Sequence, residues 1–258
     1  AFGCSSEFST ITGSHMKKLF PRLIAAAAAS ACLGAWHAVV LTFDGLADST
    51  FAPNMPFVGD GDEFYESDHY LYAFSNDAQS QPGDLVGAII HGTQAGDTCL
   101  GLVCPTDNST SFYALLNDGV LVVGRNDLAP IRMLGLSASF IAASGDVVPP
   151  TAGALRAQGM IPGGGSLTST VFLPGPVGGQ YSFSDYSFSD AFTSTEFDYV
   201  FLFGFACDAS VGCSAFTTNK AQFAIDNISV VPEPAQWLLM GLGLAALGAV
   251  VRRRHVAA

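Results

Sequence analysis

The chain has 258 residues, of which 49% are hydrophobic and only 12% are charged, and its formal net charge is −12. The apolar fraction excludes a disordered chain, and the acidic balance argues against nucleic acid as a partner because phosphate binding needs a basic surface. The 28 glycines and 20 phenylalanines favour strands and turns over helices. Since the mean hydropathy is positive at +0.38, we expect part of the hydrophobicity to belong to membrane-directed segments.

The N-terminal residues are expected to direct transport and not to join the fold. Residues 1–15 resemble the remnant of a cleaved tag that precedes Met16. A short basic stretch then leads into residues 23–33, which are apolar, rich in alanine and too few to span a bilayer. Residues 16–38 therefore predict a signal peptide and export, with lipidation of Cys32 as the alternative to ordinary cleavage.

The C-terminal residues form three consecutive parts. A Pro-Glu-Pro motif at 232–234 is followed by residues 235–251, which carry no charge, and then by three arginines at 252–254. A helix over 235–251 would be about 25 Å long at ~1.5 Å per residue, the short end of what a bilayer requires. The arginines would keep the C-terminus in the cytoplasm and the preceding chain outside it. A buried core helix is the alternative.

This order of parts resembles the PEP-CTERM sorting signal of Gram-negative bacteria that make exopolysaccharide. The residues that match are Pro232, Glu233, Pro234, Arg252, Arg253 and Arg254. In that family the signal holds the protein at the inner membrane until an exosortase cleaves near the motif, and the protein then moves to the cell surface or the extracellular matrix. The resemblance therefore implies an exosortase as processing partner, a transient single-pass anchor in the inner membrane (232–258), and an association with exopolysaccharide in a biofilm.

Residues 39–231 remain for a folded ectodomain. Their twenty acidic residues face only four basic ones, so the net charge of this part is −16. Such a surface repels anionic polymers and suits divalent cations or neutral sugars. No proline-rich linker or charge run divides these residues, and we therefore expect one domain.

Alternating or apolar segments between turn residues predict about ten strands in this domain. They lie at 39–43, 70–74, 85–90, 112–116, 120–123, 131–142, 153–161, 166–173, 180–188, 197–206 and 222–231. Asn117, Asp118 and Gly119 predict a hairpin turn between the fourth and fifth of them, because these residue types tolerate positive φ. No segment has a capped helical period, so the expected fold is all-β, a two-sheet β-sandwich of jelly-roll type.

A short aromatic repeat occurs within the predicted strand at 180–188. Residues 181–185 (YSFSD) recur at once as residues 186–190, and in each copy the aromatic side chains alternate with serine. Such a strand presents an aromatic platform to sugar rings, or it buries its aromatic face as an edge strand. We favour the edge strand, since aromatic side chains are more often core residues.

Four cysteines lie in the ectodomain: Cys99, Cys104, Cys207 and Cys213. An even set in an exported domain predicts disulfides, and four cysteines allow three pairings. The local pairing would close two short loops, each contributing at most ~2–3 kcal/mol. A four-cysteine zinc site is the alternative, but the spacings are wider than in a typical zinc knuckle.

Five carboxylates fall within nine positions near the start of the ectodomain: Asp60, Asp62, Glu63, Glu66 and Asp68. Oxygen ligands on a loop with glycines suit Ca²⁺, although the EF-hand spacing is absent and such loops are usually solvated. The same residues could supply the pair of carboxylates that a glycosidase needs ~5–10 Å apart. The prediction is no cofactor, with calcium as the alternative.

The last predicted strand contains Gln222, Phe223 and Asp226 directly before the sorting signal. This combination resembles the QFxxD subfamily of PEP-CTERM proteins, which implies an exported, anchored protein and no particular activity. Strict alternation would place Phe223 and Ile225 on one face of the strand and Asp226 and Ile228 on the other.

Taken together, the sequence predicts a non-enzymatic cell-surface or matrix protein. Neither an H-E-x-x-H nor a G-x-S-x-G motif occurs in the chain. The alternatives are a carbohydrate-binding module, with or without calcium, and a glycan hydrolase that uses the carboxylates of residues 60–68.

Overall fold

The computed structural model describes residues 38–46, 56–99, 101–210 and 212–232, all of which belong to the unit that begins at His37. The short helices in this part are the 3₁₀-helix η1 (Gly92–Gln94), α2 (Ala95–Thr98) and α3 (Asp190–Thr193). The strands are β1 (Val39–Leu41), β2 (Phe57–Gly59), β3 (Glu63–Glu66), β4 (His69–Ser75), β5 (Leu85–His91), β6 (Leu102–Val103), β7 (Ser111–Leu115), β8 (Gly119–Arg125), β9 (Ile131–Ala143), β10 (Thr151–Met160), β11 (Ser166–Pro174), β12 (Ser184–Ser187), β13 (Tyr199–Cys207), β14 (Cys213–Ser214) and β15 (Gln222–Pro232).

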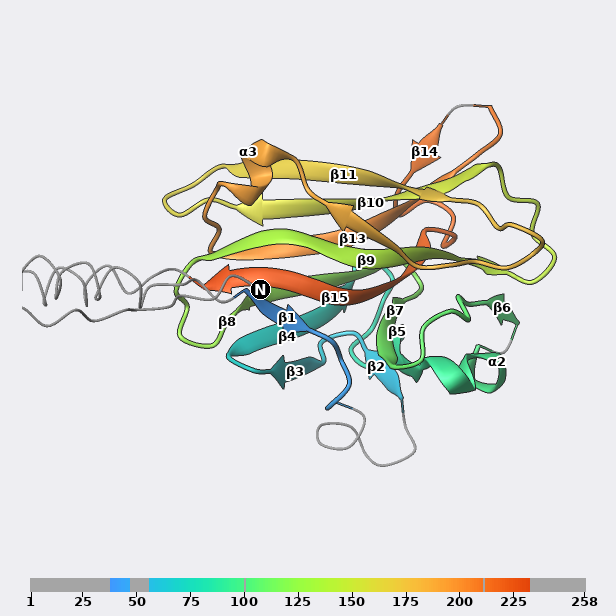
Figure 1. The fold of residues 1–258 in the computed structure, drawn as a ribbon, viewed down its shortest axis with the longest axis horizontal. Helices are drawn as coiled ribbons and strands as arrows, with labels where there is room; N and C mark the ends of the chain where they lie inside the picture. Colours follow the sequence, from blue (N-terminus) through green and yellow to red (C-terminus); the bar gives the residue numbers. More distant parts are fainter. Residues whose placement is uncertain (1–37, 47–55, 100, 211, 233–258) are drawn as a thin grey trace, which may run out of the picture. The chain divides into compact units, whose positions relative to one another are not determined.

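These strands form two antiparallel sheets, which pack as a sandwich (Figure 1). Sheet A has the order β12-β9-β15-β7-β5-β2, with β1 beside β15 and β6 beside β9. Sheet B has the order β11-β10-β13-β8-β4-β3, with β14 beside β13. The expectation of an all-β fold with two sheets is therefore confirmed.

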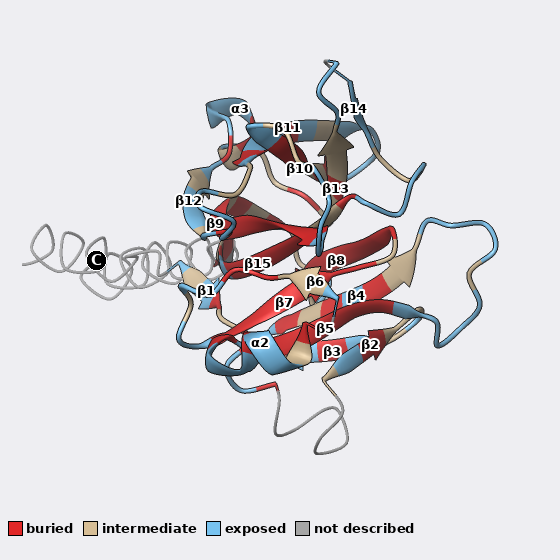
Figure 2. Cartoon of the chain, turned by 90° about the vertical axis from the view of Figure 1, so that its right-hand side faces the viewer, coloured by how far each residue is buried: buried red, intermediate tan, exposed pale blue. Residues whose placement is uncertain are grey.

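The main core lies between the two sheets and follows from the alternation of their strands. Leu71 of β4, Leu202 of β13, Phe223 of β15 and Met133 of β9 all belong to it and are buried. In Figure 2 the buried residues gather on the strands, whereas the exposed residues lie mainly on the surrounding turns and loops.

Sheet A carries a second, smaller apolar cluster on its other face. The cluster contains Ile90 of β5, Phe112 of β7 and Ile141 of β9, whose sequence neighbours point into the main core. A flap made of η1, α2 and β6 covers these residues through Ala95 and the disulfide cysteines. Both faces of sheet A are therefore buried in this region, which explains why every residue of β7 is buried.

The predicted hairpin at Asn117–Gly119 is wrong, although the turn itself is present. Asn117 and Asp118 have φ angles of 52° and 56°, as the residue types predict. However, β7 pairs with β5 and β15 in sheet A, whereas β8 pairs with β4 and β13 in sheet B. The turn therefore carries the chain from one sheet to the other. Local turn chemistry sets the φ angles but does not decide which strands become neighbours.

The expected helices of the signal peptide and the sorting signal lie outside the described residues. Within the described part of the chain, no helix is long and apolar enough to cross a membrane. The strand expected at 180–188 is shorter than predicted, since β12 covers only Ser184–Ser187.

Candidate functional site

Two strands of sheet B carry rows of aromatic side chains on the face that points away from the main core. On both strands the rings alternate with buried residues such as Leu71 and Leu202, so the period of two places every ring on one face. The rings are those of Tyr70, Tyr72 and Phe74 on β4 and of Tyr199, Phe201, Phe203 and Phe205 on β13.

The strand between the two rows has small side chains on this face. On β8, Val122 lies opposite both Tyr72 of β4 and Phe201 of β13. A Cβ atom on Gly124 would lie 2.4 Å from Cζ of Tyr70, so the glycine allows the tyrosine ring to lie across the strand. The result is a groove with a low floor and two aromatic walls.

This aromatic groove has a volume of about 720 Å³. The residues that line it are Glu63, Tyr65, Tyr70, Tyr72, Phe74, Val122, Asn126, Leu128, Tyr199 and Phe201. Its rings also contact one another. Tyr72 stacks on Phe74 with ring centroids 6.0 Å apart, and Phe74 meets Phe201 edge-on with ring centroids 6.3 Å apart. Tyr199 and Phe201 are perpendicular at 5.3 Å. Such contacts favour particular arrangements of these four rings.

Polar atoms occur at the rim of the groove. Tyr65 is 53% exposed and donates a hydrogen bond from Oη to Oε1 of Glu63 over 2.6 Å. This hydrogen bond raises the pKa of Tyr65, and burial raises the pKa of Tyr70. Both tyrosines thus carry neutral hydroxyl groups next to an aromatic surface.

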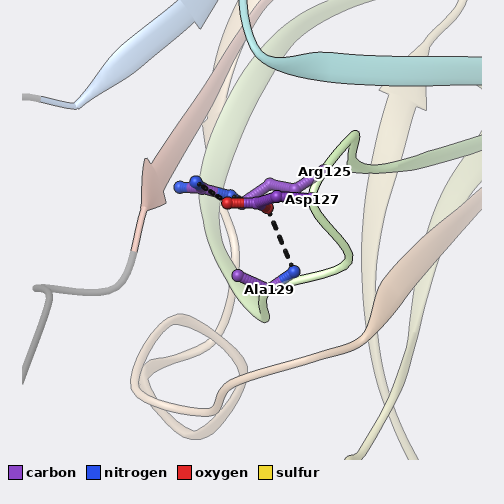
Figure 3. A network of polar contacts seen from close by, with 3 residues as sticks. All are labelled: Arg125, Asp127 and Ala129. Carbon is purple, nitrogen blue, oxygen red and sulfur yellow. Dashed lines mark hydrogen bonds and ion pairs between the residues drawn. The ribbon is translucent and has the colours of Figure 1, made fainter. Parts of the chain in front are cut away.

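One end of the groove is closed by the loop between β8 and β9. Arg125 donates two hydrogen bonds to Asp127, from Nε over 2.8 Å and from the guanidinium end over 2.6 Å, and Ala129 N donates a third (Figure 3). The hydrogen bond from Arg125 is the main reason that the pKa of Asp127 falls to about 2. The Asp127 carboxylate therefore stays ionised at neutral pH, and its hydrogen bonds stabilise the conformation of the loop. Leu128, which is 77% exposed with φ of 59°, is presented at the groove by this loop.

The aromatic face continues past the groove toward β10. The ring centroids of Phe203 and Phe205 on β13 lie 5.7 Å apart, and Cζ of Arg156 lies 4.6 Å from the ring centroid of Phe205. Arg156 also donates from Nε to Oγ1 of Thr170 on β11 over 3.1 Å. This side of the face therefore combines rings with a positive charge.

A second hollow of about 460 Å³ lies between the β9–β10 loop and the residues that precede β15. Phe140 and Ala152 form part of its apolar lining, and an ion pair of 3.2 Å joins Lys220 to Asp146 at its edge. Its lining has no comparable row of rings, so it is the weaker candidate for a binding site.

The first two carboxylates of the acidic segment accept hydrogen bonds from other groups of the protein. Asp60 accepts a hydrogen bond from Ser80 Oγ over 2.6 Å, and Asp62 accepts one from Gly59 N over 2.6 Å. The first contact joins the turn between β2 and β3 to the loop between β4 and β5, and the second lies within the turn. Both carboxylates therefore have hydrogen-bond donors within the protein.

The remaining carboxylates of this segment point to different places. Glu63 reaches the groove, whereas Glu66 accepts hydrogen bonds from the backbone nitrogens of Thr42 and Phe43 over 2.8 and 3.1 Å. Asp68 precedes β4, and its carbonyl accepts a hydrogen bond from Asn126 N over 3.0 Å. Across the described ranges, no three such side chains are grouped so that they could hold a metal ion.

The four cysteines form disulfides with the local pairing, Cys99 with Cys104 and Cys207 with Cys213. The first disulfide belongs to the small cluster on sheet A and fastens the flap. The second joins the end of β13 to β14.

The residues of the QFxxD resemblance have structural positions in β15. Gln222 donates to the carbonyl of Asn219 over 3.0 Å, and Phe223 is buried in the main core. Asp226 is 1% exposed and accepts hydrogen bonds from Asn108 Nδ2 and from the backbone nitrogen of Asn227, over 2.8 and 2.7 Å. Burial raises the pKa of Asp226 to about 6 even though these hydrogen bonds oppose the shift.

The prediction of strict alternation along β15 is wrong after Asp226. Asn227 has φ of 51° and the pairing with β9 shifts between Asp226 and Ser229. A bulge inserts an extra residue and reverses the facing of the residues after it. Ile228 therefore joins Phe223 in the main core instead of sharing a face with Asp226.

The aromatic repeat does not form an exposed platform. Tyr181 and Phe188 are buried in the main core, and Phe183 packs edge-on against Phe112 with centroids 5.3 Å apart. Strand β12 lies at the edge of sheet A, as the favoured alternative predicted. The signal that would have located the true aromatic surface is the same alternation at 70–74 and 199–205.

The sorting residues lie at the limit of the described chain. Pro232 ends β15, and Glu233, Pro234, Arg252, Arg253 and Arg254 lie outside the described residues. The known PEP-CTERM protein-sorting motif matches this chain over residues 230–254. The chain therefore carries this motif, which indicates an exported protein sorted to the cell surface.

The structure resembles some solved structures of other proteins, but only distantly. The structure is similar to that of TmCBM61 in complex with β-1,4-galactotriose, with 7% identity, coverage of 63% of this chain and 88% of that chain, and a TM-score of 0.33. It is also similar to the enzymatically active domain of tailspike protein 4 of bacteriophage CBA120, with 11% identity, coverage of 65% and 20% respectively, and a TM-score of 0.29. Both likenesses are too distant to indicate a shared function. No curated protein matches the sequence.

Proposed function

We propose that this protein is an exported, non-enzymatic component of the cell surface or matrix that binds a neutral polysaccharide in the aromatic groove of sheet B. The observation that carries this proposal is the pair of aromatic rows on β4 and β13, separated by Val122. Aromatic faces pack against the apolar faces of sugar rings, while nearby hydroxyl and carboxylate groups bind the sugar hydroxyls.

The size and chemistry of the groove suit a chain of sugars. The groove extends from β3 to β13, across four neighbouring strands. At ~4.8 Å between strands this distance is about 14 Å, enough for more than one sugar ring. Tyr65, Asn126 and Glu63 supply polar atoms along it.

Charge restricts the ligand to neutral glycans. The sequence of the ectodomain carries a net charge of −16, so an anionic polymer would be repelled at low ionic strength. Glu63 contributes a further negative charge within the groove itself.

A binding role is supported over hydrolysis by the carboxylates of the groove. Hydrolysis by the usual mechanism needs two carboxyl groups ~5–10 Å apart on either side of the glycosidic bond. Glu63 is the only carboxylate among the described residues that line the groove. Asp60, Asp62 and Glu66 are engaged by hydroxyl or backbone donors, so we propose binding that requires no calcium.

The sorting motif supports a route to the surface. We propose that residues 235–251 anchor the chain transiently in the inner membrane and that an exosortase cleaves near Pro232, Glu233 and Pro234. The released ectodomain would then reside in the exopolysaccharide of a biofilm. Mass spectrometry of the surface-exposed protein is expected to find the C-terminus near residue 234. Surface protein that retains Arg252–Arg254 would contradict this route.

The binding proposal is tested by affinity electrophoresis in gels that contain neutral or uronic-acid polysaccharides. The wild-type protein is expected to be retarded by a neutral glycan, equally with calcium and with chelator. Tyr72→Ala and Tyr199→Ala should each weaken retention about fivefold, since stacking on one aromatic ring contributes ~1 kcal/mol.

The matched control is Phe57→Ala, which removes a 52% exposed ring on sheet A. It should leave retention unchanged. If no neutral glycan retards the wild-type protein, or if Phe57→Ala weakens retention as much as the groove variants do, the aromatic groove is not a glycan site.

A further inference from the structure

Strand β11 forms one edge of sheet B and lacks two usual protections of an edge, a charged side chain and an interior proline, although α3 lies beside part of it. Its nine residues, Ser166–Pro174, include no charged side chain, and its single proline is the last residue. Among the described strands only β10 pairs with it, with continuous register from Gly153 to Met160 of β10. Its other side therefore presents a row of backbone donors and acceptors that can pair with a further strand.

The side chains of β11 are suited to such pairing. Thr168, Thr170 and Phe172 are exposed on the outer face, and the ring of Phe172 is 64% exposed. Threonine, valine and phenylalanine all have high strand propensity. The backbone nitrogen of Ser189 donates a hydrogen bond to Oγ of Ser169, whose side chain is buried. This hydrogen bond therefore occupies no backbone group of β11.

The other edges of the two sheets are short or charged. Strand β3 has four residues with a glutamate at each end, β12 has four residues with an aspartate among them, and β2 has only three residues. Short or charged edge strands are common means of preventing pairing between molecules. Within the described part of the chain, β11 is thus longer than each of these edges, and unlike β3 and β12 it carries no charge.

A second copy of this protein can pair with β11 through backbone groups alone, because two antiparallel copies of one edge present matching donors and acceptors. Two ectodomains with sequence charges of −16 repel each other, so they can approach closely only where the surface carries no carboxylate. Strand β11 provides such a surface.

We propose that two copies of the protein pair β11 with β11 in antiparallel orientation, around a two-fold axis near Thr170. Sheet B then continues from one subunit into the other. In this register Thr168 faces Phe172 of the partner subunit, and the reciprocal contact follows from the symmetry. This self-association is independent of glycan binding, because the groove lies on β3, β4, β8 and β13.

The nearest positive charges do not oppose the pairing. Arg156 lies on β10, one strand from the edge, and donates to Thr170. The two Arg156 residues of the dimer would be three strand spacings apart, about 14 Å at ~4.8 Å each, beyond the ~8–10 Å screening distance at physiological salt. We expect pairing through a single strand edge to bury less area than a standard stable interface, and therefore a dissociation constant in the micromolar range.

The test is sedimentation equilibrium of the full chain over a concentration series, in a mild detergent that keeps its apolar terminal segments soluble. The mass is expected to rise from 26.8 kDa toward twice that value. The double variant Thr168→Lys/Phe172→Lys places lysine opposite lysine at both contacts and should raise the dissociation constant at least tenfold. The matched control is Thr93→Lys/Phe57→Lys, which changes an exposed threonine and an exposed phenylalanine outside sheet B and should dimerise like the wild type.

A cysteine at the two-fold axis gives an independent measurement. In a background that lacks Cys4 and Cys32, Thr170→Cys is expected to form an intermolecular disulfide, whereas the exposed control Thr106→Cys is not. Unchanged near-ultraviolet circular dichroism would show that the lysine variant is folded. The proposal is overturned if the wild type remains monomeric, if both lysine variants dimerise equally, or if the two cysteine variants cross-link to the same extent.

Discussion

The buried carboxyl of Asp226 should make the stability of the domain fall as the pH rises. Burial raises its pKa to about 6 from an ordinary value of 3.8. The folded state therefore keeps this proton at pH values where the unfolded chain has released it, so the free energy of unfolding decreases between pH 4 and pH 6. A difference of about two pKa units corresponds to at most ~3 kcal/mol.

The prediction is measured by comparing the wild type with Asp226→Asn, which has nearly the same size and cannot ionise. Unfolding by guanidinium chloride is followed by near-ultraviolet circular dichroism, because the seven tyrosines lie between residues 65 and 199. The free energy of unfolding of the variant minus that of the wild type should rise by up to ~3 kcal/mol between pH 4 and pH 7. All other titrating groups are common to both proteins and cancel in this difference.

Asp127→Asn is the control with the opposite shift. The hydrogen bond from Arg125 holds the pKa of Asp127 at about 2, so its contribution is complete above pH 4 and should not vary from there to pH 7. A flat difference for Asp226→Asn as well would refute the reasoning that desolvation dominates at Asp226. A difference that falls with pH would mean that the hydrogen bonds from Asn108 and Asn227 outweigh its burial.

The remaining predictions concern the groove, the flap and the core. Gly124→Ala should push the ring of Tyr70 out of its position, because the added Cβ would lie 2.4 Å from Cζ; we expect severalfold weaker retention on a neutral glycan and a change in unfolding free energy below ~1 kcal/mol. Replacing Cys99 and Cys104 by serine should lower the unfolding free energy by about 2 kcal/mol, and hydrogen exchange should accelerate in the flap before the rest of the domain. Phe223→Ala should cost ~3–5 kcal/mol in a denaturation experiment, because the residue is buried in the main core.

The sequence alone determined the features that depend on neighbouring residues. The alternation at residues 70–74 and 199–205 predicted strands because side chains of a strand point to opposite faces in turn. The local spacing of the cysteines allowed the pairing that the structure has. The sorting signal was readable for the same reason, since its three parts are consecutive in the chain, and the motif match at 230–254 agrees.

Only the tertiary structure decided which surface is open and which is covered. The two rows of aromatic side chains are more than a hundred residues apart in the chain, and they form a groove because β8 pairs with both β4 and β13. The repeat at 181–190 has the same local pattern, yet Tyr181 and Phe188 are buried in the main core between the sheets, and Phe183 packs against the small cluster under the flap. Alternation along a strand gives it two faces with different side chains. Which of the two faces is exposed to solvent depends on the distant elements that cover the opposite face. For this protein, that arrangement places the open aromatic face on sheet B and a long uncharged edge at β11.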